Sequence, residues 1–163
     1  MKIIISGAGE VGSHLAKMLR NEANDICVID SNQQRLTALS ETADVVTVCG
    51  NPASIEVLKN AGAEKADLFV AVNPSTSQNV NVVCSALAKS LGSKKVVCRV
   101  NNEEYLAYDN KYLFSDMGID LLFYPEKIAA GEIVDLLKRS ASTEAMEFGR
   151  GKLQISVYKL EED

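Results

Sequence analysis

A glycine-rich segment near the N-terminus limits the folds open to this chain more than any other feature. It reads Gly7-Ala8-Gly9-Glu10-Val11-Gly12, follows the apolar run Ile3-Ile4-Ile5, and precedes a strand-like run over 26–29 that ends at Asp30. A strand, a glycine turn, a helix and a second strand ending in an acid are typical of a dinucleotide-binding βαβ unit. The first glycine permits the tight turn, the second lets the backbone approach a pyrophosphate, and the third lets helix and strand pack closely. The unpaired amides of the helix start then face the phosphates.

Asp30 predicts which nucleotide this turn accepts. At the end of the second strand its carboxylate is placed to accept hydrogen bonds from both ribose hydroxyls of an adenosine, and it repels a 2′-phosphate. We therefore expect NAD rather than NADP. Two alternatives stay open: Asp30 caps the next helix, a role equally open to Ser31 or Asn32, and Arg35, one helical turn further on, approaches a phosphate.

Six short apolar runs alternate with helical stretches along the chain. They are β-branched and apolar throughout rather than alternating, as expected for a parallel sheet covered by helices on both faces. Right-handed crossovers then give an α/β, Rossmann-type, doubly wound six-stranded parallel sheet. The runs cover residues 2–6, 26–30, 45–48, 68–72, 95–100 and 121–124.

Three helices have readable apolar stripes. The helix after the glycine turn has Val11, Leu15, Met18 and Leu19, with His14 beside them as a packing residue rather than a catalyst. The helix that ends near Gly92 has Val80, Val83, Cys84, Leu87 and Leu91. A helix starting at Pro125 has Ile128, Ile133, Leu136 and Leu137 available for burial.

The composition and hydrophobic pattern of the sequence change after Arg139. Residues 140–143 form a small, polar link, and residues 152–160 alternate like a strand of a different kind. We expect a nucleotide-binding domain over 1–139, and a linker and extra strand over 140–163 that lead into a domain absent from this chain. A lone strand of this kind pairs with another chain or begins a further domain.

Other candidate site residues follow the strands at the carboxyl edge of the sheet, where ligands bind in such folds. Gly50 and Asn51 follow the third strand near the expected adenine position, although an ordinary turn explains them too. Val72 and Asn73 lie where the strand order reverses, and Arg99 ends the fifth strand as a phosphate ligand or a structural ion pair. The candidate nucleotide-binding residues are Gly7, Ala8, Gly9, Glu10, Val11, Asp30, Ser31, Arg35, Gly50, Asn51, Val72, Asn73 and Arg99.

Composition excludes several classes of function. The net charge of −5 argues against binding nucleic acid or anionic lipid directly. No apolar segment approaches the length of a membrane span and no secretion signal is visible, so we expect a cytoplasmic protein. The four cysteines show no C-x-x-C pairing and are interpreted as buried structural thiols. With a single histidine, we expect no structural metal.

The sequence shows no recognisable set of catalytic residues. A nicotinamide dehydrogenase needs a proton donor such as His, Lys or Tyr. Tyr108 and Lys111 are three residues apart, whereas the Tyr-x-x-x-Lys pair of short-chain dehydrogenases needs four. We therefore expect the domain to bind a nucleotide rather than to catalyse a reaction with it. The competing hypothesis is the cofactor domain of an NAD-dependent dehydrogenase that lacks its substrate domain. A redox-sensing repressor would need a basic DNA-binding helix, and the acidic chain has none.

These residues together resemble the N-terminal KTN or RCK domain of TrkA-type regulators of potassium uptake. Besides the glycine turn, the resemblance is carried by Val28-Ile29-Asp30, Cys49-Gly50-Asn51-Pro52, Ala61-Gly62-Ala63, Ala66-Asp67-Leu68-Phe69-Val70-Ala71-Val72, Leu91-Gly92-Ser93-Lys94-Lys95-Val96-Val97, Arg99-Val100-Asn101-Asn102 and Tyr124-Pro125-Glu126-Lys127. In that family Arg99 would face the ligand phosphates, and Glu126 would be a candidate for a cation site. Asn51 replaces the family's usual aspartate, which makes the contact on the adenine side less certain.

The resemblance implies a regulatory subunit rather than an enzyme. It implies binding of NAD or NADH, or of ADP or ATP as in sister proteins, and a partner that is a membrane-embedded potassium channel or transporter. The subunit would form a homodimer or higher homo-oligomer in the cytoplasm, held at the inner face of the membrane through its partner. Ligand binding would gate that partner by shifting the populations of two dimer arrangements.

Overall fold

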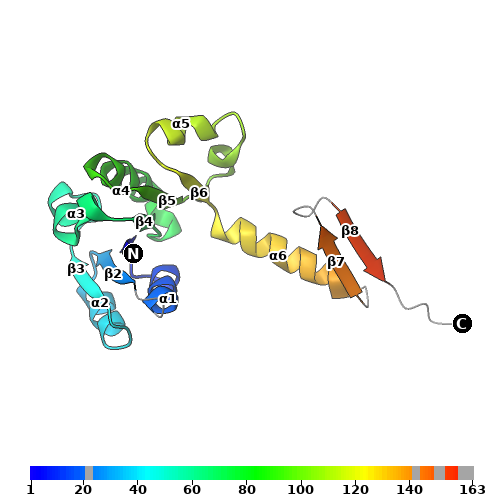
Figure 1. The fold of residues 1–163 in the computed structure, drawn as a ribbon, viewed down its shortest axis with the longest axis horizontal. Coiled ribbons are helices and arrows are strands. Elements are labelled where there is room, and N and C mark those ends of the chain that lie inside the picture. The colour runs from blue at the N-terminus through cyan, green and yellow to red at the C-terminus, as the bar shows by residue number, and fades with distance from the viewer. Residues whose placement is uncertain (21–23, 141–143, 149–152, 158–163) are drawn as a thin grey trace, which may run out of the picture. The chain divides into compact units, whose positions relative to one another are not determined.

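A six-stranded parallel sheet forms the core of the first part of the chain (Figure 1). The computed structural model describes residues 1–20, 24–140, 144–148 and 153–157, and the chain divides into two compact units, Met1–Tyr124 and Pro125–Asp163. The sheet lies in the first unit, with strands β1 (Lys2–Ser6), β2 (Asp25–Asp30), β3 (Val46–Cys49), β4 (Leu68–Ala71), β5 (Lys95–Arg99) and β6 (Leu121–Phe123). Its α-helices are α1 (Glu10–Leu19), α2 (Gln33–Ser40), α3 (Ile55–Ala61), α4 (Gln78–Leu91) and α5 (Lys111–Asp116), joined by 3₁₀ turns η2 (Ala63–Lys65), η3 (Ser75–Ser77) and η4 (Glu103–Leu106).

The strand order confirms the predicted doubly wound sheet. The strands lie in the order β3-β2-β1-β4-β5-β6, and every neighbouring pair is parallel. The order reverses between β1 and β4, so the crevice at their carboxyl ends is the expected ligand position. Each predicted run coincides with a strand, and the two sets of ends differ by at most one residue.

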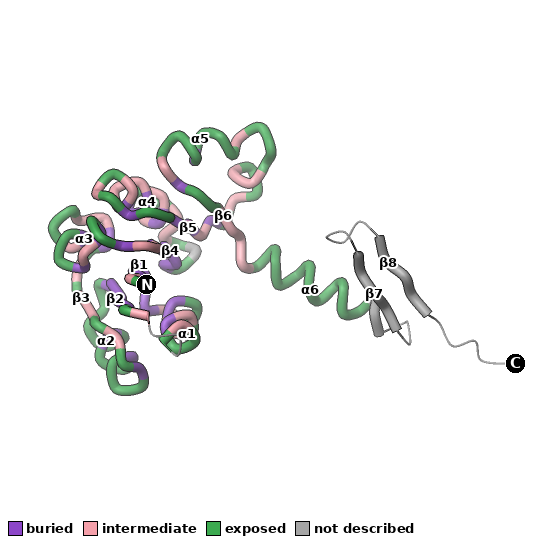
Figure 2. The backbone as a smooth tube through the Cα atoms, in the orientation of Figure 1, coloured by how far each residue is buried: buried purple, intermediate pink, exposed green. Residues whose placement is uncertain are grey.

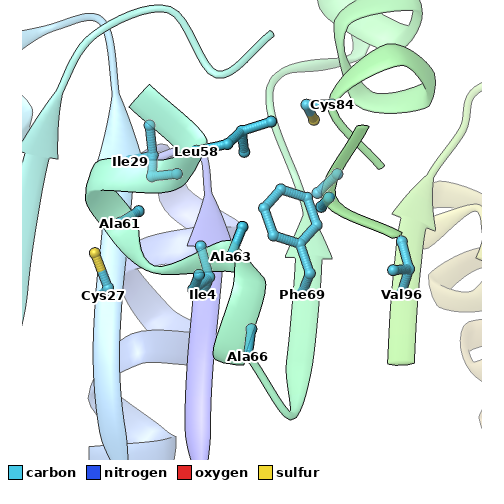
Figure 3. Packing of buried hydrophobic residues seen from close by; sticks show 12 residues of the cluster. Ile4, Cys27, Ile29, Leu58, Ala61, Ala63, Ala66, Phe69, Cys84 and Val96 are labelled. Carbon is cyan, nitrogen blue, oxygen red and sulfur yellow. The ribbon is translucent and has the colours of Figure 1, made fainter. Parts of the chain in front are cut away.

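Alternate residues of β1 supply the two halves of the core. Ile3 and Ile5 pack with residues of α1 and α2 on one face of the sheet. Ile4 packs on the other face with Leu58 of α3 and Phe69 of β4 (Figure 3). Buried positions gather along these central strands (Figure 2). Because both faces are covered, β1 is apolar on both sides, as a parallel central strand requires.

The buried face of helix α4 overlaps the predicted stripe only in part, since Cys84 is the one fully buried residue that belongs to both. Its buried residues are small or polar: Asn81, Cys84, Ser85 and Ala88. Val83, which the predicted stripe includes, is 47% exposed, while Leu87 and Leu91 only flank the core. Small side chains let the helix backbone approach the sheet closely, and the larger apolar residues then lie at its margins. The helix does end at Gly92, as predicted.

The second unit contains a strand that the sequence does not reveal. Helix α6 (Pro125–Ser140) starts at Pro125 as predicted. The final strand, β8 (Leu153–Val157), is not a lone strand, because it pairs antiparallel with β7 (Glu144–Phe148). Most of the predicted polar link, 141–143, and the ends of the predicted strand, 152 and 158–160, lie outside the described residues. The domain boundary after residue 139 stays a prediction; the compact units divide earlier, before α6.

The apolar residues of α6 are exposed rather than buried. Each is more than half exposed: Ile128, Ile133, Leu136 and Leu137.

Three of the four cysteines are buried thiols, and the fourth is not. Burial raises the pKa of Cys27 and Cys98 to about 11 and that of Cys84 to about 12. Cys49 is exposed, so its interpretation as a buried thiol is wrong. It is the last residue of β3, at the carboxyl edge where the strand leaves the core.

Candidate functional site

The glycine turn has the close contacts that its sequence predicts. Gly7 has a φ of +111°, and its N–H donates to the carbonyl of Ile29 at 2.7 Å. A Cβ at Gly7 would lie 2.8 Å from the backbone nitrogen of Asn73, and a Cβ at Gly12 would collide with the carbonyl oxygen of Gly7. Both positions therefore require glycine, because backbone occupies the space on their side-chain side. Gly9, in contrast, faces open space.

Asp30 ties the glycine turn to the end of β2. Its carboxylate accepts the N–H of Ala8 at 2.7 Å through one oxygen and the N–H of Asn32 at 2.8 Å through the other. The residue is 4% exposed. The cap of α2 is Asn32, whose Oδ1 accepts the N–H groups of Gln34 and Arg35. The alternative in which Asp30 caps that helix is therefore wrong.

A crevice of about 250 Å³ opens between the glycine turn and the carboxyl ends of β4 and β5. Arg35 reaches it from α2, with its Nη1 3.9 Å from an Asp30 oxygen and its side chain 48% exposed. Arg99 reaches it from the end of β5. Two guanidinium groups and the N-terminus of α1 make this crevice suited to an anionic ligand. Its lining residues are Gly9, Glu10, Arg35, Val72, Pro74 and Arg99.

Asn51 serves a local turn in the structure. Its Oδ1 accepts the N–H of Ala53 at 3.0 Å, while the N–H of Gly50 donates to the carbonyl of Asp30 at 3.0 Å. The turn after β3 is thus attached to the residue that we expect to bind ribose. Neither Gly50 nor Asn51 lines the crevice, and their contact with adenine stays a prediction.

A buried polar network, which the sequence pattern does not reveal, lies behind the crevice. The side chain of Asn73 donates to Ser6 Oγ at 2.8 Å and to Asn81 Oδ1 at 2.9 Å. Asn81 in turn donates to the carbonyl of Arg99 at 3.2 Å. The sequence feature that could have indicated this network is Asn81, a polar residue one helical turn before Cys84 on α4. The predicted stripe starts one position earlier, at Val80, and so does not include Asn81. The structure thus commits the Asn73 amide group to internal support.

Five of the predicted residues line the crevice, and three more form the hydrogen-bonded turn behind it. The five are Gly9, Glu10, Arg35, Val72 and Arg99, and the three are Gly7, Ala8 and Asp30. Ser31 is exposed and accepts a hydrogen bond from the Cys49 thiol. Glu126 lies in the first turn of α6, in the second unit, so its role at a cation site stays a prediction. Pro74, which follows Asn73 in the turn after β4, also lines the crevice, although it is not among the candidate nucleotide-binding residues.

The predicted stripe of α1 lines an open apolar groove on the sheet. Met18 is 60% exposed and Val11 is 37% exposed, whereas Leu15 and Leu19 are half-buried and pack against the core, so the stripe is buried only in part. Val11 lines this groove and is not among the residues that line the crevice, so its contact with the nucleotide stays a prediction. Val72 lines both the groove and the crevice. The groove measures about 450 Å³ and is lined by Val11, His14, Leu15, Met18, Leu19, Leu68, Val70, Val72, Val97 and Phe123.

Proteins of potassium uptake systems are similar to this chain in sequence. Trk system potassium uptake protein TrkA from Haemophilus influenzae is 37% identical over 161 residues, which are 98% of this chain and 35% of the relative. The chain thus spans about a third of the length of the curated relatives that it matches.

Two solved structures have the same fold. The TrkA-N domain of inner membrane protein ybaL from Escherichia coli has a TM-score of 0.69 at 23% identity, and covers 83% of this chain and 96% of its own. The GsuK channel bound to NAD has a TM-score of 0.62 at 19% identity, and covers 91% of this chain and 24% of its own. The model of the TrkA-N domain family matches residues 3–125. Since this match takes in the glycine turn, the crevice and all six strands of the sheet, the chain belongs to the TrkA-N domain family.

Proposed function

We propose that this chain is the nucleotide-sensing part of a cytoplasmic regulatory subunit of a Trk-type potassium uptake system. The main support for this proposal is the crevice, where Arg35 and Arg99 lie beside the start of α1. Behind the crevice, Asp30 holds the glycine turn through the N–H of Ala8. Membership in the TrkA-N family and the Trk system relatives supply the physiological context. Among the helices of the described residues, none is both long and apolar enough to cross a membrane. The Trk system relatives are the reason for proposing a membrane-embedded potassium channel or transporter as the partner.

The geometry of Asp30 favours NAD or NADH as the ligand. Each carboxylate oxygen already accepts one backbone N–H, and each can accept a further hydrogen bond from a ribose hydroxyl. The same charge disfavours a 2′-phosphate. ADP and ATP contain the same adenosine and diphosphate groups as NAD, so they would compete with it for the site beside Asp30 and the glycine turn. The related GsuK channel has been seen bound to NAD.

A binding role accounts for the crevice better than catalysis does. Among the described residues that line it there is no histidine, lysine or tyrosine to transfer a proton to a substrate. His14 lines the apolar groove instead. The competing hypothesis of a dehydrogenase cofactor domain would be supported if the full-length protein oxidised or reduced a substrate with NAD at ordinary enzyme rates.

The apolar groove and α6 support a homodimer as the responsive assembly. The groove is lined by apolar side chains except for His14, so it suits an apolar occupant. We propose that α6 of a second copy occupies it, because this helix exposes several large apolar residues, among them Ile128, Ile133 and Val134. Helix α1 and Val72 belong to both the groove and the crevice. Nucleotide binding and docking would therefore be linked, with a coupling of about 1–3 kcal/mol.

Sedimentation equilibrium with and without NADH tests this function. We expect a dimer whose dissociation constant changes about 5- to 150-fold with saturating NADH, because linkage is reciprocal. Met18→Glu places a charge in the groove and should weaken the dimer, whereas Lys17→Glu, on an exposed position of the same helix outside the groove, should not. A chain that stays monomeric at high concentration would contradict the dimer, and a dimer that ignores NADH would contradict the sensing.

A further inference from the structure

Asn81 is a buried side chain with a complete set of hydrogen bonds. It lies in the first turns of α4 and is 1% exposed. Its Oδ1 accepts the backbone N–H of Asn73 at 3.0 Å and the Asn73 side-chain amide at 2.9 Å. Its Nδ2 donates to the carbonyl of Asn73 at 3.2 Å and to that of Arg99 at 3.2 Å. An asparagine side chain can donate two hydrogen bonds and accept two, so this capacity is fully used.

The side chain stands where β4 and β5 stop pairing. Their last paired residues are Ala71 and Cys98. Beyond this pair Asn81 joins the two segments, through the backbone N–H and carbonyl of Asn73 on one side and the carbonyl of Arg99 on the other. Because one buried side chain holds backbone groups of both segments, the bridge fixes the path of both strand ends.

The two bridged segments are the walls of the crevice. Val72 and Pro74, which flank Asn73, line it on one side, and Arg99 lines it where β5 ends. The remaining buried positions of α4, such as Cys84 and Ala88, pack against the sheet without bonding to either wall. A helix–sheet contact alone does not need an amide at position 81.

We propose that Asn81 is a positioning residue of the nucleotide site: it sets the distance between the loop after β4 and the end of β5, and so places Arg99 relative to the glycine turn. This inference rests on the proposed nucleotide binding. Because Asn73 also bonds to Ser6, directly before the glycine turn, the bridge connects β1, β4, β5 and α4.

The variant Asn81→Asp tests the bridge with little change of shape. It keeps an acceptor for the Asn73 amides but loses both donors, and it turns an oxygen toward the carbonyls of Asn73 and Arg99. Burial and the facing carbonyls raise the pKa of the introduced carboxyl, and its protonated form can donate one of the lost hydrogen bonds. Of the residues bonded to Asn81, Cys84 and Arg99 carry titratable side chains. The pKa of Cys84 is raised to about 12 and arginine stays charged.

The experiment measures the affinity of the folded variants for NADH, from the change in NADH fluorescence on binding. It is done at a temperature where circular dichroism shows that each variant is fully folded. Relative to the wild type, Asn81→Asp should bind about tenfold or more weakly near pH 8 and recover part of this loss near pH 6. The matched control is Ser93→Ala. It removes a buried hydrogen bond, from Ser93 Oγ to the carbonyl of Ala63 at 2.8 Å, beyond the far end of α4, and should leave affinity within about twofold.

Asn81→Ser provides a second variant that tests the same bridge if Asn81→Asp does not fold. Its side chain is too short to span both walls, so affinity should fall about threefold or more, with no dependence on pH beyond that of the wild type. Wild-type affinity in whichever variant folds would overturn the inference while leaving nucleotide binding intact. A wild-type chain that binds neither NADH nor ADP would overturn the proposed function and the inference together.

Discussion

Gly9→Ala separates the binding role of the glycine turn from its structural role. Gly9 is the N-cap of α1, with a φ of −73° and a ψ of −171° that alanine also adopts. A Cβ built on it has no atom within 4 Å, and the residue lines the crevice. The added methyl group would therefore occupy space that we assign to the pyrophosphate, without disturbing the protein around it.

The expected change in stability is small. Alanine is a poorer N-cap than glycine, which costs roughly 0.5–1 kcal/mol. Alanine also restricts the unfolded chain, which returns about 0.4–1 kcal/mol. These effects oppose each other, so the free energy of unfolding should change by less than about 1 kcal/mol.

The expected change in nucleotide affinity is much larger. The methyl group would hold the pyrophosphate away from the amides of the first turn of α1, and one charge-assisted hydrogen bond is worth about 1.5–3 kcal/mol. Losing one such bond weakens binding by about 10- to 150-fold. Urea denaturation measures the first quantity and calorimetric titration with NADH the second. A variant with wild-type affinity would refute the placement of the pyrophosphate at this turn, and a strongly destabilised variant would refute the open space at Gly9.

Three further predictions concern other parts of the fold. Gly12→Ala should destabilise the protein by about 2 kcal/mol or more in urea denaturation, because its Cβ would meet the carbonyl of Gly7, which is backbone and cannot turn aside; a neutral variant would contradict that contact. A maleimide near neutral pH should label exposed Cys49 well before the three buried thiols, whose pKa values are raised by burial, and mass spectrometry would measure the order of labelling. If the nucleotide reaches the turn after β3, saturating NADH should slow the labelling of Cys49. At Asp120, burial raises the pKa, but hydrogen bonds from Lys89 and from the N–H of Val96 outweigh it and lower the pKa overall; its stabilisation is therefore present above the unfolded pKa and lost as the pH falls through the folded one. Asp120→Asn should cost about 0.5–1 kcal/mol at neutral pH, because the pair with Lys89 is partly exposed, and its stability should converge with that of the wild type in acid; a constant difference at every pH would contradict this.

The sheet could be predicted because its signals are local. Each strand is a short apolar run, and β1 needs apolar residues on both faces, so Ile3-Ile4-Ile5 is readable without knowledge of its partners. The glycine turn is equally local, since Gly7 and Gly12 meet each other within one turn. The positions of Asp30 and Arg99 then follow from the strands that they end.

The missed features depend on contacts between distant segments. The buried face of α4 is set by how closely the helix approaches the sheet, which favours Ser85 and Ala88 over the larger Val83. The role of Asn81 depends on where β4 and β5 separate, and nothing in the sequence marks that point. Strand β7 has no apolar run of its own and is defined by its pairing with β8.

Calorimetric titration of the wild type with NADH and with NADPH tests most directly whether the crevice beside Asp30 binds a nucleotide with a free 2′-hydroxyl. We expect NADH to bind and NADPH to bind at least about tenfold more weakly, because Asp30 would face the 2′-phosphate. Asp30→Ala should weaken NADH binding by about 1.5–3 kcal/mol, through loss of the ribose hydrogen bonds. Equal affinity for the two dinucleotides, or no binding of either, would contradict the account.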